Sequence, residues 1–180
     1  VGAWRYTDDT NMALSIYELL IRHGSIDQDQ LAQSFAKHFV PTRGYGHGAR
    51  RLLIEIQNGG DWRTLSRQMF GGQGSYGNGA AMRIAPLGAY FADDLDQCVE
   101  QARLASEVTH AHPEGIAGGI AVAAAAAIAW RSRENGAPDR AAFIDQVIAH
   151  VPESEVRSKL TRARDIGSNT SMDGVISQLG

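Results

Sequence analysis

An alanine-rich stretch decides the fold class of this sequence: residues 116–130 read IAGGIAVAAAAAIAW. The stretch is apolar on every face of a helix, as expected of a helix that other helices surround. It is shorter than the ~20 residues that a membrane-spanning helix needs. We therefore predict a buried central helix, and no membrane partner.

The segments on either side of this stretch repeat apolar residues at helical spacing. Met12, Ile16, Leu19 and Leu20 lie on one face of a first helix, which Gly24 ends as a left-handed cap. The same reasoning predicts helices near residues 31–39, 52–56, 62–70, 80–87 (bent by Pro86), 95–105, 140–150 and 153–166. No stretch alternates as a strand does, so we predict an all-α fold. We expect a compact multi-helix globule that forms a single domain over residues 1–180.

Composition excludes some classes of function. The 180 residues carry a net charge of −3, whereas a nucleic-acid-binding surface needs a clear basic excess. The single cysteine, Cys98, cannot form an internal disulfide, and its apolar neighbours predict a small core residue rather than a nucleophile. A reducing, cytoplasmic location is expected.

Thr7-Asp8-Asp9-Thr10 places two carboxylates and two hydroxyls at the start of the first helix. Such hard oxygen donors suit Mg²⁺, Mn²⁺ or Ca²⁺ rather than zinc. The same residues are also favoured helix caps, and the helix dipole stabilises their negative charge. The motif alone leaves both interpretations open.

Two glycine-rich segments precede helices. The first is Arg43-Gly44-Tyr45-Gly46-His47-Gly48, and the second runs from Gly74 to Arg83 as GSYGNGAAMR. Glycine lets backbone N–H groups approach an anion, and a helix N-terminus adds partial positive charge. Plain connectors have similar compositions. Phe70 precedes the second segment and Tyr76 lies within it. The two rings can hold a flat base between them, or simply belong to the core.

Thr109-His110-Ala111-His112-Pro113 joins two predicted helices. Two histidines at this spacing invite a zinc interpretation, but no other soft ligand accompanies them. We expect them to act as hydrogen-bonding groups.

The order of these motifs resembles the ADP-ribosylglycohydrolase family. This family includes the dinitrogenase reductase-activating glycohydrolases and the ADP-ribosyl-acceptor hydrolases. The resemblance covers residues 3–130, and four ordered motifs are more specific than any one of them. It implies an all-α enzyme with a pair of divalent ions, Mg²⁺ or Mn²⁺, beneath an ADP-ribose cleft.

The resemblance also implies roles for single residues. Thr7, Asp8 and Asp9 would be metal ligands, and Asp8 and Asp9 would take part in catalysis. Phe70 and Tyr76 would sandwich adenine, and His110 would face the ligand. The remaining substrate-binding residues would be Gly44, Gly46 and Gly48 around the pyrophosphate, and Gly74, Ser75, Tyr76, Gly77 and Asn78 near the phosphates and the distal ribose.

The implied function is hydrolysis of the glycosidic bond between ADP-ribose and a modified protein side chain or related acceptor. Two departures from the family pattern stand beside it: an acidic residue upstream of Thr7 and a late Asp-x-Asp-Thr motif are not in the sequence. We expect both ends of the parent protein to be missing, and the chain alone to be inactive. A non-catalytic ADP-ribose-binding module and a crystallin-like structural relative are the alternatives.

Overall fold

Helices form all the regular structure in the part of the chain that the computed structural model describes, which is residues 5–133, 136, 138–167 and 169–180. No β-strand occurs in these residues, so the all-α prediction is confirmed. The elements are α1 (Asp8–His23), α2 (Gln28–Lys37), η1 (Pro41–Arg43), α3 (His47–Gln57), α4 (Trp62–Gly72), η2 (Ala81–Arg83), α5 (Ala85–Tyr90), α6 (Leu95–Glu107), α7 (Pro113–Arg131), α8 (Arg140–Ile148), α9 (Glu155–Asp165) and α10 (Met172–Leu179).

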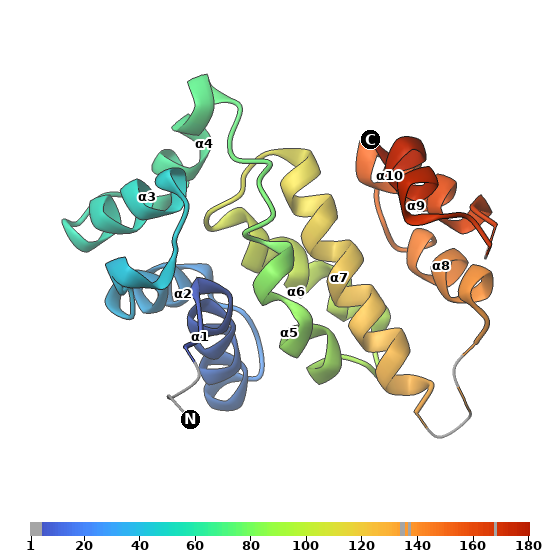
Figure 1. The fold of residues 1–180 in the computed structure, drawn as a ribbon. Coiled ribbons are helices and arrows are strands. Elements are labelled where there is room, and N and C mark those ends of the chain that lie inside the picture. The colour runs from blue at the N-terminus through green and yellow to red at the C-terminus, as the bar shows by residue number, and fades with distance from the viewer. Residues whose placement is uncertain (1–4, 134–135, 137, 168) are drawn as a thin grey trace.

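The long helix α7 runs through the middle of the molecule (Figure 1). Helices α5 and α6 pack along it, α1 to α4 lie on one side, and α8 to α10 lie on the other. The main hydrophobic core joins α1, α2, α5, α6 and α7, and a smaller cluster lies where α7 meets α8 and α9. The helix predicted from the alanine-rich stretch is therefore the centre of the fold.

Small residues let the neighbouring helices approach α7 closely. A Cβ added at Gly88 of α5 would lie 2.2 Å from the Ala123 carbonyl oxygen, and one added at Gly119 of α7 would lie 2.3 Å from Ser106 Oγ of α6. Nine of the 19 residues of α7 are buried, more than in any other described helix. Close packing of this kind leaves no room for a larger side chain.

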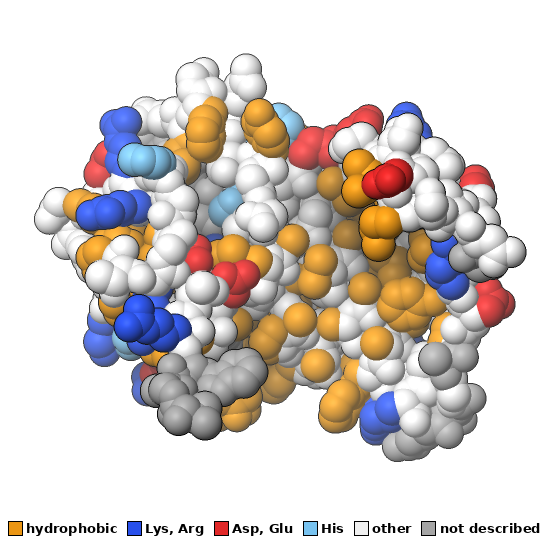
Figure 2. Space-filling model, in the orientation of Figure 1, with side chains coloured by type: hydrophobic (Ala, Val, Ile, Leu, Met, Phe, Trp, Pro, Cys, Tyr) orange, Lys and Arg blue, Asp and Glu red, His pale blue; other side chains and the backbone are white. Residues whose placement is uncertain are grey.

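The expectation that other helices surround α7 holds only in part. Its C-terminal Trp130 is 49% exposed, and Val122 is only partly covered. In the view of Figure 2, hydrophobic side chains gather on the surface that α5 and α7 form. By length and composition α7 is apolar enough to cross a membrane, and half of its apolar stretch is buried inside the molecule, as in core helices.

Two predicted segments differ from the structure. A single bent helix from Ala80 to Leu87 was expected, whereas η2 and α5 are separate, and Pro86 stands in the first turn of α5. Proline is tolerated there because the first N–H groups of a helix lack intrahelical partners. The helix α4 loses regular geometry at Met69–Gly71. The prediction for Cys98 is confirmed, since its thiol is buried and free.

Candidate functional site

The acidic first turn of α1 forms one end of the candidate site. Thr7 occupies the N-cap position without making a side-chain cap; its hydroxyl donates instead to Asp9 Oδ2 at 2.5 Å. Burial raises the pKa of Asp8, hydrogen bonds from backbone N–H groups lower it, and the negative charge of Asp9 raises it further. The capping interpretation of this motif therefore lacks its characteristic hydrogen bond, and the three side chains remain a set of hard oxygen donors.

The first glycine-rich segment is fastened beside this turn. A Cβ added at Gly44 would lie 3.6 Å from Asp8 Oδ1, so the loop backbone passes close to the carboxylate. The amide of Asn11 donates to the Tyr45 hydroxyl at 2.8 Å and to the His38 carbonyl. Arg43 donates to the Tyr6 carbonyl at 2.9 Å and stacks on the Tyr6 ring. Asn11 and Tyr45 thus position the loop, a role that the sequence motifs did not reveal.

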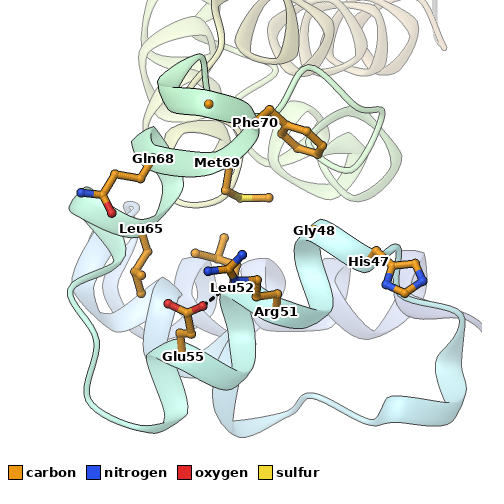
Figure 3. A pocket seen from close by; sticks show the side chains of 10 residues that line it. His47, Gly48, Arg51, Leu52, Glu55, Leu65, Gln68, Met69 and Phe70 are labelled. Atoms are coloured by element: carbon orange, nitrogen blue, oxygen red, sulfur yellow. Dashed lines mark hydrogen bonds and ion pairs between the residues drawn. The ribbon is translucent and has the colours of Figure 1, made fainter.

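Farther along this segment, α3 and α4 enclose a cavity of about 510 Å³, shown in Figure 3. Gly48 lies under the Phe70 ring: a Cβ there would be 3.3 Å from Cζ of Phe70 and 2.6 Å from Cε of Met69. Phe70 adopts φ 52°, which is rare for a bulky residue. The cavity is lined by His47, Gly48, Arg51, Leu52, Glu55, Leu65, Gln68, Met69, Phe70 and Gly71.

The second glycine-rich segment packs tightly against the turn between α6 and α7. A Cβ added at Gly74 would lie 2.6 Å from the backbone nitrogen of His112, and one added at Gly115 would lie 2.6 Å from the Ser75 carbonyl oxygen. The Ser75 hydroxyl accepts from the Gly77 N–H at 3.3 Å. Tyr76 is 65% exposed and meets the His112 ring edge-on at 5.3 Å.

His110 lies inside this packed region. It is 6% exposed, and a Cβ added at Gly79 would lie 2.8 Å from its Nε2. Its Nδ1 is 2.7 Å from the Thr109 hydroxyl. Burial, together with the positive charge of Arg83, lowers the pKa of His110 to about 3, so the ring is neutral at physiological pH. The histidines act as hydrogen-bonding groups, as expected; Nδ1 of His112 accepts the Glu114 N–H at the start of α7.

Arg83, the last residue of the second glycine-rich segment, is a buried cation whose charge acts on Tyr45 and on His110. Arg83 is fully buried; it donates to the Ala105 carbonyl at 2.9 Å and lies over the Phe35 ring. Its Nε has no hydrogen-bond partner in the described chain. In the sequence, Arg83 stands among apolar residues of a predicted helix, and this position could have indicated a buried charge. The motif analysis gave Arg83 no role.

The predicted site residues thus form three local groups. Asp8 lies beside Gly44, Gly48 lies beside Phe70, and the Ser75–Gly77 backbone lies beside the turn that holds His110. Phe70 and Tyr76 contact different neighbours, so their pairing around a base stays a prediction. Asn78 is exposed, and Gly46 precedes α3 with open space around it. Among the described residues, no three His, Cys, Asp or Glu side chains gather as a metal-ligand cluster.

Comparison with known proteins places these residues in context. The sequence model of the ADP-ribosylglycohydrolase family matches residues 2–180. The chain is 34% identical to ADP-ribosylhydrolase ARH3 of Gallus gallus over 167 residues, and 33% identical to the Homo sapiens protein of that name over 168 residues. Each alignment covers 90% of the chain but only 44% and 45% of the relative. The chain therefore spans less than half the length of these relatives. It is also 31% identical to the uncharacterized protein YegU of Escherichia coli over 125 residues, which cover 66% of the chain and 36% of that protein.

Proposed function

This chain belongs to the ADP-ribosylglycohydrolase family, and we propose that the protein carrying it hydrolyses the glycosidic bond between ADP-ribose and a modified protein side chain or related acceptor. The observation that carries the proposal is the approach of Gly44 to Asp8. It brings a glycine-rich, anion-accepting backbone to within a few ångströms of the paired carboxylates. A diphosphate and a ribose joined in one ligand need such neighbouring sites.

The two glycine-rich segments supply the nucleotide-binding part of the proposed site. Gly46 directly precedes the N-terminus of α3, where backbone N–H groups and the helix dipole favour a phosphate. Phe70 and Tyr76 are 59% and 65% exposed, although aromatic side chains of this size usually gain stability by burial. We assign both rings to the adenine, and Ser75, Gly77 and Asn78 to the phosphates and the distal ribose.

The acidic turn supplies the hydrolytic part. Thr7, Asp8 and Asp9 offer oxygen ligands that fit Mg²⁺ or Mn²⁺ as part of a ligand set, and a pair of ions needs ligands beyond these three residues. When bound, such an ion would make a nearby water more acidic and help to orient the ribose. One of the two carboxylates accepts a proton from the attacking water. Their negative charge also stabilises the positive charge that develops on the sugar ring.

Release of ADP-ribose from a mono-ADP-ribosylated protein tests the proposal. We expect the protein that carries this chain to release ADP-ribose in the presence of Mg²⁺ or Mn²⁺, and a loss of at least about a hundredfold in Asp8→Asn and Asp9→Asn, as is usual when an essential proton acceptor is removed. Asp93→Asn, which removes an exposed carboxylate outside the site, is the matched control. Equal turnover in all three variants would contradict the proposal.

Titration with ADP-ribose separates binding from turnover. Tyr76→Ala should weaken binding by about 1–3 kcal/mol if the ring stacks on the base. Tyr17→Ala removes a similarly exposed ring from the far part of α1 and should leave the affinity unchanged. Binding without turnover would favour a non-catalytic ADP-ribose-binding module, and neither would favour a structural protein.

A further inference from the structure

The imidazole of His110 is held in one orientation by its surroundings. The turn between α6 and α7 lies beside the segment that follows α4 (Figure 1), and Gly79 brings its backbone against the ring. A Cβ at Gly79 would lie 2.6 Å from Cε1 and 2.8 Å from Nε2, and one at Gly77 would lie 3.8 Å from Nε2. The Nε2 edge therefore faces the backbone of the second glycine-rich segment.

The opposite edge of the ring contacts Thr109. This residue is 1% exposed, and its Oγ1 lies 2.7 Å from Nδ1 of His110. One proton is shared across this contact: either the hydroxyl donates to Nδ1, or a protonated Nδ1 donates to the hydroxyl. In the second case the hydroxyl proton needs another acceptor, and the hydroxyl makes no other hydrogen bond in the described part of the chain.

Each arrangement leaves one proton without a protein acceptor: the proton on Nε2 in the first case, and the hydroxyl proton in the second. Among the described side chains, only Nε of Arg83 is a fully buried polar atom without a partner, so Nε2 of His110 keeps access to solvent, whereas Thr109 is 1% exposed. A donor that no acceptor can reach is the more destabilising of the two. The hydroxyl of Thr109 is therefore the donor. A neutral imidazole that accepts at Nδ1 carries its proton on Nε2. The low pKa of His110 keeps the ring neutral. The choice between the two tautomers, rather than a charge, therefore decides whether Nε2 donates or accepts a hydrogen bond.

The surroundings of His110 favour an anionic acceptor. The charge of Arg83 acts on His110, and its guanidinium contacts a carbonyl, a thioether sulfur and an aromatic ring, without a carboxylate in the described residues. An uncompensated buried cation makes the local potential positive. Nε2 makes no hydrogen bond to the described protein, so its proton is available to a ligand.

We propose that Thr109 is a positioning residue: it fixes His110 as the Nε2–H tautomer, which then donates a hydrogen bond to a phosphate oxygen of the bound nucleotide. This inference rests on the proposed function for the identity of the ligand. The tautomer itself is a property of the ligand-free protein.

Two substitutions test this role. Thr109→Val removes the hydroxyl and keeps the shape, whereas Thr109→Ser keeps the hydroxyl. Nitrogen-15 NMR of the imidazole, recorded without ligand, should show one Nε2–H tautomer in the parent protein and in Thr109→Ser, and both tautomers in Thr109→Val. ADP-ribose should bind about tenfold more weakly to Thr109→Val, as for weakening one hydrogen bond to a charged group, and within about twofold of the parent to Thr109→Ser.

An Nδ1–H tautomer in the parent protein would overturn the inference. So would unchanged affinity in Thr109→Val, or a failure of Thr109→Ser to restore it. If Thr109→Val does not fold, the tautomer in the parent and the affinity of Thr109→Ser still decide the matter. If the parent protein does not bind ADP-ribose, the proposed function fails, and the ligand-free spectrum still decides whether Thr109 sets the tautomer.

Discussion

The two glycine-rich segments of this chain have similar compositions but are held in different ways. In the segment that runs from Gly74, glycine is needed because neighbouring atoms leave no room for a side chain: added Cβ atoms at Gly74 and Gly79 would lie 2.6 Å from atoms of His112 and His110. In the segment of residues 43–48, an added Cβ at Gly44 would meet only ordinary contact with Asp8, and one at Gly46 would meet nothing within 4 Å. The close contacts of Gly48 in this segment are with the side chains of Met69 and Phe70 rather than with backbone. Side-chain hydrogen bonds of Asn11 and Arg43 hold the segment of residues 43–48 instead.

This difference separates two uses of glycine. Where backbone packs on backbone, as at Gly74 and His112, glycine is structural and fixes the local shape of the backbone. Where the space beside the backbone is open, as at Gly46, glycine leaves room that a ligand can occupy. We therefore expect a substitution at Gly74 to lower stability more than ligand affinity, and one at Gly46 to lower ligand affinity more than stability.

The largest expected effect is on stability, in Gly74→Ala. Gly74 has φ 78°, a conformation that disfavours alanine, and the new methyl group would meet the backbone of Ala111 and His112. Left-handed strain and overpacking together should reduce the free energy of unfolding by about 3 kcal/mol. Urea denaturation measures this change.

Gly46→Ala is the matched control for that experiment. Gly46 has φ −61° and ψ 155°, which alanine adopts freely, and the methyl group would enter open space. Its free energy of unfolding should stay within about 0.5 kcal/mol of the parent, while ADP-ribose affinity falls if the ligand uses that space. A loss of stability in Gly46→Ala as large as in Gly74→Ala would remove the distinction between the two segments.

An intermediate effect is expected from acid, because the packed segment encloses His110. Its folded-state pKa of about 3 lies below the ordinary value of 6.5, owing to burial and to the charge of Arg83. Between these values the unfolded chain binds a proton that the folded chain does not, so stability falls as pH decreases. From pH 7.5 to 5 this group should remove about 2 kcal/mol from the free energy of unfolding.

His110→Gln should lack this contribution. The comparison is between the pH slopes of the free energy of unfolding, so a constant loss of stability in the variant does not affect it. Identical slopes in the parent and in His110→Gln would show that the buried imidazole does not drive the acid sensitivity.

The smallest effect concerns the end of α4, where the Phe70 ring covers Gly48 of the first segment. Phe70 holds φ 52°, which glycine adopts without strain. Phe70→Gly should therefore be more stable than Phe70→Ala by about 1 kcal/mol, the reverse of the usual order in a helix. Both variants lose the ring that covers Gly48. If Phe70→Ala is the more stable of the two in thermal unfolding, the left-handed conformation at this position is not maintained.

Local patterns predicted much of this protein. The spacing of Met12, Ile16 and Leu19 predicted α1, and the left-handed cap at Gly24 was also predicted. The order of the motifs identified the family, because ordered loops at helix starts are a property of sequence. Patterns failed where backbone geometry depends on distant neighbours: at the break between η2 and α5, and at the kink of α4.

The sequence by itself determined the all-α architecture, the central helix and the motif residues that we propose for a nucleotide site, since helical periodicity and glycine-rich motifs are read within a few residues. Only the tertiary structure decided how those residues are used. Arg83 became a buried cation because α1, α2 and α6 close around it, and Thr109 and Asn11 gained roles because their partners are fixed by packing. Burial and hydrogen bonding between residues far apart in the chain depend on the assembled core, which no local pattern encodes.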